Sequence, residues 1–195
     1  MEKFKAAYRS SDGSVPVSEE RLNEYKDKAP TVLLDLWRTD GFGKYNDGLI
    51  EVIDPTHFEP SLWTWLGKEV PKYIPIAING FGDLFYFKNL PQDEINLRAG
   101  LKEEVCLIDI QHRRIEHLTW NLEEFFDEFL TSTEEREKWL WEDLFRQAIM
   151  EQGSLANNEV FTVTPILALG GALEIANLRK GNAQVYQDIA FQMTM

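Results

Sequence analysis

The sequence predicts an α+β fold, with a mixed, mainly antiparallel sheet, flanking helices and a mostly helical C-terminal unit. Three observations predict it. Apolar and polar residues alternate in several short runs before residue 118, which is typical of strands. Glycine-containing turns separate these runs, as in hairpins. From Asn121 onward, apolar residues recur at helical spacing instead. We therefore expect two units, residues 1–118 and 119–195.

The first elements are expected to be helices. Ser18 is a good N-cap, because its side chain can accept a hydrogen bond from the next turn, and acidic residues follow it. Pro30 favours the start of a second helix, which Gly41 would end. A turn at 46–48, a strand at 49–53 and a short helix at 61–66 should follow, the last closed by Gly67.

Two hairpins are expected next. Residues 73–78 and 84–87 flank Asn79-Gly80-Phe81-Gly82, where glycines suit a tight turn. Pro75 has no N–H to donate, so its strand should lie at a sheet edge or contain a bulge. Residues 105–110 and 114–118 form the second predicted hairpin.

The C-terminal unit should begin at a capping box that starts with Asn121. Phe125, Phe126 and Phe129 then form an apolar helical stripe. One longer helix is expected from Ser132 to Gly153. A strand at 160–163 and a last amphipathic helix, centred on Val185, Ile189 and Met193, complete the prediction.

Charge narrows the classes of partner. The chain has 33 acidic and 20 basic residues, for a net charge of −13. Such a surface repels nucleic acids and anionic membranes and attracts a basic protein. Residues 121–143 hold nine acids and two bases, a net −7 and over half of the total. The same acid excess would also serve simply to keep the protein soluble.

Compartment signals are consistent with a cytoplasmic protein. Cys106 is the single cysteine, so no internal disulfide can form, and its apolar neighbours predict a buried thiol. The first residues lack the apolar stretch of a signal peptide, and no apolar run is long enough for a membrane span.

Residues that could perform catalysis do not form a recognisable pattern. The three histidines, His57, His112 and His117, lack the spacing of a zinc site. No serine lies in a nucleophile elbow, and the glycine pairs lack the third glycine of a dinucleotide loop. We expect no enzyme, no metal and no organic cofactor. Four aromatic residues beside turns are expected to anchor the core: Trp37, Phe81, Phe85 and Phe87.

The aromatic and glycine landmarks carry a family resemblance. Trp37-x-x-x-Gly41, Tyr45-x-Asp47-Gly48-Leu49, Asp54-Pro55 and Phe81-Gly82-Asp83-Leu84-Phe85 resemble the GAD-like domain of bacterial polymorphic-toxin systems. The tail is similar to the domain that often follows it, through Asp143-Leu144-Phe145-x-x-Ala148, the segment 153–161 and the segment 165–171. One departure is Tyr186, which stands about where relatives often carry histidine.

This resemblance implies an immunity protein that neutralises a DNase effector of type VI secretion. The implied partner is a toxin with a basic DNA-binding cleft, which an acidic protein could fill in place of phosphate. Our candidate contacts are the acidic helix face and the turn at Asp83: Asp83, Glu123, Glu124, Asp127 and Glu128. The alternatives are a nucleic-acid-associated accessory module, which should show a basic stripe, and a carboxylate-based hydrolase, which should show a pocket with two converging acids.

Overall fold

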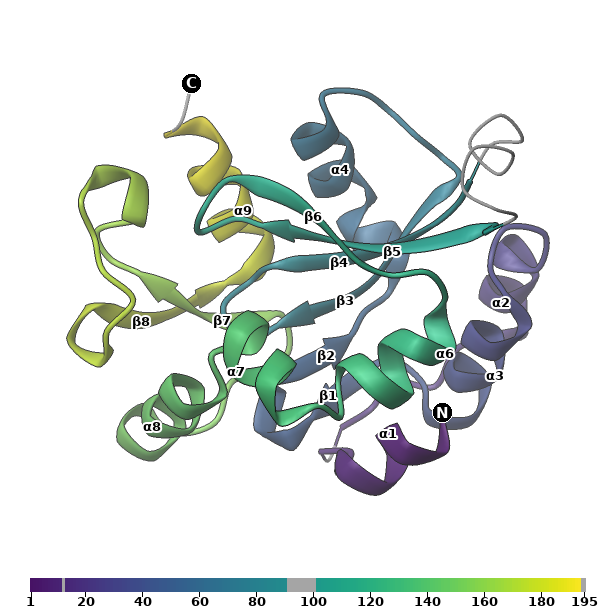
Figure 1. The fold of residues 1–195 in the computed structure, drawn as a ribbon, viewed down its shortest axis with the longest axis horizontal. Coiled ribbons are helices and arrows are strands. Elements are labelled where there is room, and N and C mark those ends of the chain that lie inside the picture. The colour runs from purple at the N-terminus through teal and green to yellow at the C-terminus, as the bar shows by residue number, and fades with distance from the viewer. Residues whose placement is uncertain (12, 91–100, 194–195) are drawn as a thin grey trace.

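The centre of the molecule is a six-stranded antiparallel sheet in which each strand lies beside its neighbour in sequence (Figure 1). The computed structural model describes residues 1–11, 13–90 and 101–193. The α+β prediction is confirmed, and all strand pairs of this sheet are antiparallel. The strands are β1 (Gly43–Tyr45), β2 (Ile50–Val52), β3 (Tyr73–Asn79), β4 (Leu84–Asn89), β5 (Glu103–Asp109) and β6 (Arg114–Thr119).

The two predicted hairpins are β3–β4 and β5–β6. Strand β3 lies inside the sheet, between β2 and β4, so the expectation of an edge strand is wrong. The alternative, a bulge, is confirmed, because the β3–β4 register shifts between Pro75 and Ala77. The bulge leaves Ile76 out of the ladder, while Pro75 remains opposite Tyr86. The pairing with β2 ends at Ala77, so Pro75 has no β2 partner that needs its missing N–H.

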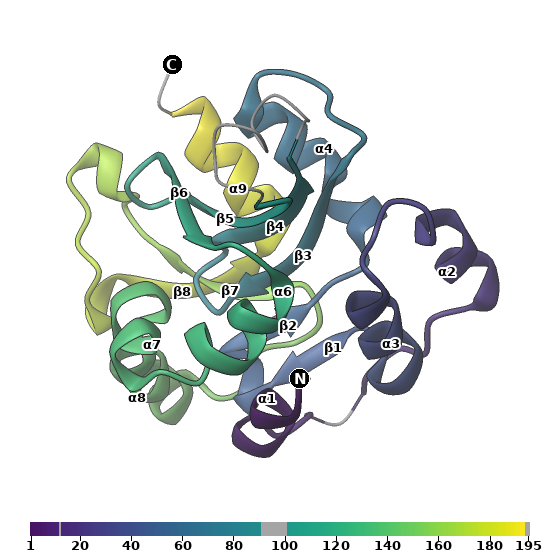
Figure 2. The ribbon, with the colours of Figure 1, turned by 45° about the vertical axis from the view of Figure 1, so that its right-hand side comes forward.

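Helices cover both faces of the sheet (Figures 1 and 2). Alternate residues of β4 divide between two apolar clusters: Phe85 and Phe87 belong to the larger one, Leu84 and Tyr86 to the smaller one. The larger cluster packs under α1 (Glu2–Ala7), α2 (Glu19–Tyr25) and α3 (Thr31–Asp40), and also under the start of the C-terminal region. The smaller cluster packs under α4 (Pro55–Leu66) and α9 (Ala183–Gln192).

The C-terminal region begins with α6 (Leu122–Glu124), which continues into the π-helical turn η2 (Phe125–Phe129). The single long helix expected next is instead two helices, α7 (Thr133–Leu140) and α8 (Glu142–Gln152). Trp141 breaks it by adopting a left-handed conformation, with φ 46°. Its ring then packs against Phe81, with ring centroids 5.2 Å apart, so tertiary packing overrides a locally helical pattern.

A small two-stranded sheet follows, made of β7 (Glu159–Val163) and β8 (Leu178–Asn182), with the short turns η3 (Leu167–Leu169) and η4 (Ile175–Asn177) between them. The expected strand at 160–163 is therefore confirmed. The last helix is also present, but the three apolar residues on which the prediction centred lie on its exposed side. Val185, Ile189 and Met193 are 56, 41 and 56% exposed, whereas Tyr186 and Gln187 are buried.

One apolar core connects the two expected units. The larger cluster contains Phe85 and Phe87 from the sheet together with Phe125, Phe145 and Phe161 from the C-terminal region. Trp37, Phe81, Phe85 and Phe87 are all fully buried, as predicted. Cys106 is buried as well, and burial raises the pKa of its thiol to about 11.

Candidate functional site

The acidic segment that begins at Asn121 is fixed by its cap and its phenylalanines. The Asn121 side-chain oxygen accepts a hydrogen bond from the Glu124 N–H at 2.8 Å, and the Glu124 carboxylate accepts one from the Trp120 N–H at 3.1 Å. This reciprocal arrangement satisfies free N–H groups at the helix start. Phe125 and Phe126 are fully buried, so the acids between them and the next turn are directed outward.

Asp127 is occupied by an intramolecular contact. Its Oδ1 accepts a hydrogen bond from the Phe4 N–H at 3.0 Å, and its Oδ2 lies 3.1 Å from the amino nitrogen of Met1. Partial burial works against ionisation, but the Phe4 N–H and the Met1 amino group hold the pKa of Asp127 below its ordinary value. The neighbouring Glu128 forms an exposed ion pair with Lys3. Helix α1 therefore covers one side of the expected acidic face.

Two acids of the segment, Glu124 and Glu128, line an open groove between β6 and α7. The groove has a volume of about 470 Å³, and three carboxylates line it: Glu124, Glu128 and Glu135. Glu135 was not among the expected residues, because the sequence does not reveal which side of α7 faces β6. The other lining residues are His117, Leu118, Thr119, Phe129, Ser132, Lys138 and Trp139.

The groove has mixed chemistry that suits a cationic partner. Glu135 accepts a hydrogen bond from the Trp139 indole N–H at 2.9 Å, which orients both side chains. The Trp139 ring already attracts cations, since Lys138 Nζ lies 4.8 Å and Arg114 Cζ lies 5.5 Å from its centroid. The three acids are opposed by Lys138 in the lining and by Lys3, which pairs with Glu128. The negative charge that remains would repel a phosphate backbone and attract lysine or arginine side chains.

Glu123 lies apart from this groove. It borders a second depression, of about 330 Å³, which is also lined by Pro30, Val32 and Glu103. Burial raises the pKa of Glu103, and the charge of Glu123 raises it further. The four helix acids expected to form one face are thus divided between a groove, a second depression and a contact with α1.

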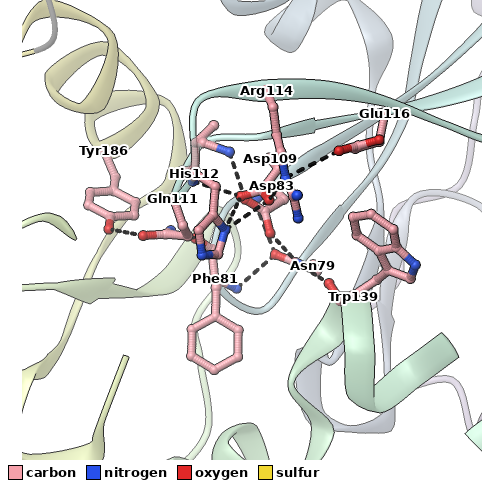
Figure 3. Close-up of polar contacts among 11 residues, drawn as sticks. Asn79, Phe81, Asp83, Asp109, Gln111, His112, Arg114, Glu116, Trp139 and Tyr186 are labelled. Atoms are coloured by element: carbon pink, nitrogen blue, oxygen red, sulfur yellow. Dashed lines mark hydrogen bonds and ion pairs between the residues drawn. The ribbon is translucent and has the colours of Figure 1, made fainter. Parts of the chain in front are cut away.

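The expectation that a turn projects Asp83 outward is corrected by the structure (Figure 3). Asp83 is only 1% exposed. Its carboxylate accepts hydrogen bonds from the Asn79 side chain at 2.8 Å and from the Ile110 N–H at 2.9 Å. The turn folds its carboxylate back between β3 and β5, where these donors satisfy it, so Asp83 has no surface to offer to a partner.

Asp83 is part of a buried polar network at one end of the sheet. Burial, followed by the charge of Asp109, raises the pKa of Asp83 well above its ordinary value. Asp109 is itself 2% exposed and accepts hydrogen bonds from His112 and from Arg114 Nε, the latter at 2.9 Å. The two acids fix the turns that connect β3 to β4 and β5 to β6.

The same network reaches the last helix. Tyr186 donates its hydroxyl proton to Gln111 at 2.9 Å and accepts a hydrogen bond from the Val163 N–H at 3.1 Å. Gln111 in turn donates to the Phe81 carbonyl oxygen at 3.0 Å (Figure 3). Tyr186 therefore connects α9, β7 and the turn before β4, which is a structural role.

A smaller pocket contains two acids, as the hydrolase alternative would require. It has a volume of about 150 Å³, and Glu51, Asp54 and His57 are among its lining residues. Both acids have structural partners: Asp54 caps α4 by accepting the Thr56 N–H at 3.0 Å, and Glu51 lies 3.9 Å from Lys44 Nζ. Burial raises the pKa of Glu51 and lowers that of Lys44.

Within residues 1–11, 13–90 and 101–193, no three His, Cys, Asp or Glu side chains are grouped so as to hold a metal ion. None of the helices in these ranges is both long and apolar enough to cross a bilayer.

Comparison with known families agrees with this architecture. The profile of the GAD-like domain matches residues 1–99, and the profile described as T6SS immunity protein Tdi1, C-terminal, matches residues 119–194. The chain belongs to the GAD-like domain family, and its C-terminal region matches the C-terminal domain of a family of type VI secretion immunity proteins. No curated protein matches it significantly.

A solved structure shares the fold. The crystal structure of Atu4351 from Agrobacterium tumefaciens is 17% identical in sequence and superposes with a TM-score of 0.69. The match covers 95% of this chain and 85% of that chain. The arrangement of sheet, covering helices and C-terminal region is therefore not particular to this sequence.

Proposed function

We propose that this protein is a cytoplasmic, non-enzymatic immunity protein that binds the basic nuclease domain of a cognate type VI secretion toxin and occludes its DNA-binding cleft. The match of the C-terminal region to an immunity family supports the class of function. The nuclease nature of the partner is inferred from charge, because a DNA-binding cleft must be basic to hold phosphates. The net charge of −13 makes this protein a complementary ligand.

The acidic groove between β6 and α7 is the observation that carries the proposal. Glu124, Glu128 and Glu135 line one recess, and an aromatic ring that already attracts cations stands beside them. Carboxylates in a concave site focus the field more strongly than the same charges on a convex surface. Asp83 and Asp127 are removed from the contact set, because the first is buried and the second is held by α1.

The test is the triple variant Glu124→Gln, Glu128→Gln and Glu135→Gln. It is assayed against the product of the adjacent gene, taken as the toxin because immunity genes usually follow the gene of their toxin. Glutamine keeps an acceptor oxygen for the Trp120 and Trp139 N–H groups, so the fold should be retained. We expect the association rate to fall about tenfold or more at low salt, since steering is lost. Cells that express the toxin should also lose protection.

A matched control removes the same charge elsewhere. Glu19→Gln, Glu20→Gln and Glu69→Gln alter three exposed acids outside the groove. This control should slow association only slightly, because long-range attraction depends weakly on charges distant from the interface. Equal effects of the two triples would place the interface elsewhere. Failure of the toxin domain to bind at all would refute the proposed partner.

A further inference from the structure

Strand β6 is the open edge of the six-stranded sheet. It pairs with β5 on one side, from Arg114 opposite Asp109 to Thr119 opposite Val105, and it ends the strand order. In an antiparallel edge strand, alternate residues direct their N–H and C=O groups away from the sheet. For the described residues, no backbone hydrogen bond outside the β5 ladder involves residues 114–119.

The opposite edge of the sheet, formed by β1, is not open in this way. There, β1 is partly covered by the N-terminal segment, which forms bridges from Ser10 to Tyr45 and from Val15 to Phe42. Strand β6 contains no proline, and its middle is exposed, with Ile115 47% accessible. Residues 114–117 of this edge are in regular register with β5, and no further strand covers them in the described sheet, so they can serve as a template for an added strand.

The open edge and the acidic groove are parts of one surface. His117, Leu118 and Thr119 of β6 form one wall of the groove, and Glu124, Glu128 and Glu135 lie among its other lining residues. A chain that paired with β6 would therefore direct every second side chain toward these carboxylates. The intervening side chains would lie on the other face of the sheet, the face of Ile108 and of its cross-strand partner Ile115.

We propose that the toxin docks an extended segment onto β6 as a seventh strand, with lysine or arginine at alternate positions facing the groove and apolar residues between them. This inference rests on the proposed function and specifies how the partner is held. Main-chain hydrogen bonds would supply affinity, while the carboxylates would select for basic side chains, as in other cases of strand addition. Because the groove is lined by Glu124, Glu128 and Glu135, its charge favours a basic protein segment as the partner.

Residue-resolved hydrogen exchange tests this directly, with the toxin domain encoded by the adjacent gene as the probe. The β5 ladder already protects the inward N–H groups of β6. Strand addition should protect the outward ones in addition. The gain in protection on binding should therefore fall on alternate residues of 114–117, the part of β6 that is in regular register with β5. Docking through side chains alone would not produce this alternation.

Proline substitution provides a second readout. Ile115 and Glu116 lie in regular register opposite Ile108 and Leu107, so only one of the two N–H groups points outward. Of the variants Ile115→Pro and Glu116→Pro, the one that retains the wild-type melting temperature has lost the outward N–H. It should bind the toxin domain at least about tenfold more weakly, whereas Glu116→Ala should bind nearly as well as wild type.

The outcomes separate the two proposals. Binding without alternate protection, or a folded proline variant of undiminished affinity, overturns strand addition and leaves the immunity function standing. If both proline variants unfold, the exchange pattern alone decides. Absence of any complex with the toxin domain overturns both proposals.

Discussion

Asp83 is buried, although its place in a turn of the sequence predicts an exposed side chain. The turn residues around it are Asn and Gly, which usually lie at the surface, yet the carboxylate is enclosed by Asn79, Ile110 and the nearby Asp109. Burial and the charge of Asp109 both favour the neutral acid. The hydrogen bonds that the Asp83 carboxylate accepts offset this rise in its pKa only partly. The stability of the folded protein should therefore depend on the protonation of Asp83.

The expected consequence is a stability that depends on pH through Asp83. Its folded pKa is raised, so its contribution is fully present below the unfolded pKa of about 4 and is lost as pH rises through the folded value. Asp83→Asn should remove this dependence. Chemical unfolding at pH 5 and pH 8 measures the free energy of unfolding of both proteins. As the pH rises inside that window, the value for the variant should increase relative to that for wild type by up to about 1.4 kcal/mol per pH unit. A difference in the free energy of unfolding that stays constant across this range would contradict the assignment of the pH dependence to Asp83. The pKa of Glu51 is also raised, but Glu51 is present in both proteins, so its effect cancels in the comparison.

Phe85 is expected to be an anchor of the larger core cluster. It is fully buried, and its ring centroid lies 5.2 Å from that of Phe125. Phe85→Ala should cost about 3–5 kcal/mol in the free energy of unfolding, through lost transfer energy and a cavity. Urea unfolding measures this. Met150→Ala, at a residue 79% exposed, is the control and should stay within about 0.5 kcal/mol.

At the scale of elements, the turn from Asn79 to Asp83 is the point where the sheet meets the C-terminal region. The Asn79 side chain accepts hydrogen bonds from the Phe81 and Asp83 N–H groups, which fixes the turn. Gly80 donates to the Leu49 carbonyl oxygen and accepts from the Phe161 N–H at 2.8 Å, so this turn also binds β7. A side chain at position 80 would meet the ring of Phe145, 2.2 Å from an ideal Cβ.

This close approach gives a prediction for the element. Gly80→Ala should destabilise the protein by about 1–3 kcal/mol, because the Phe145 ring must move within a packed core. In a Phe145→Leu background the cost should be smaller by at least about 0.5 kcal/mol, since the contact is relieved. A double-mutant cycle by chemical unfolding measures the coupling. If the effects of the two substitutions on the free energy of unfolding are additive, a side chain at position 80 does not displace the Phe145 ring and the prediction is wrong.

Some elements were predictable because their signals are local. Ser18, Asn121 and Ser132 each cap a helix through a side-chain hydrogen bond to a nearby N–H, and Gly67 closes α4 in a left-handed conformation. Helix α4 starts earlier than expected, at Pro55, and α1 was not expected at all. α1 is only six residues long, and it packs because Phe4 enters a cluster with Tyr8, Tyr45 and Phe126.

At the scale of the whole molecule, one core holds both family regions together. Residues from α1 to β8 contribute to the larger cluster, and Tyr186 connects α9 to β7 and the sheet turn. The two regions matched by separate families therefore both contribute apolar side chains to one cluster. Division of the chain at residue 118 would expose Phe85 and Phe87, which pack in that shared cluster.

We accordingly expect a single cooperative unfolding transition for the full chain. Circular dichroism and tryptophan fluorescence should give coincident thermal curves, because the larger cluster contains residues of both regions. A fragment of residues 1–118 should lack a cooperative transition and bind a hydrophobic dye. Two resolved transitions, or a fragment that unfolds cooperatively with a buried core, would show that the regions are independent domains.

The sequence alone determined strands β2 to β7, three helix caps, the burial of the phenylalanine stripe and the acidic charge, because each depends on residues close in the chain. Strands β1 and β8 were not expected. Only the tertiary structure decided which charged and apolar faces stay exposed. Glu124 and Glu128 reach the groove while Asp127 is taken by α1, and Asp83 is enclosed by a strand 27 residues away. Val185 and Ile189 remain exposed because Tyr186 and Gln187 find buried hydrogen-bond partners on the sheet turns. Burial is set by contacts between distant segments, and a local pattern contains no record of which segments will meet.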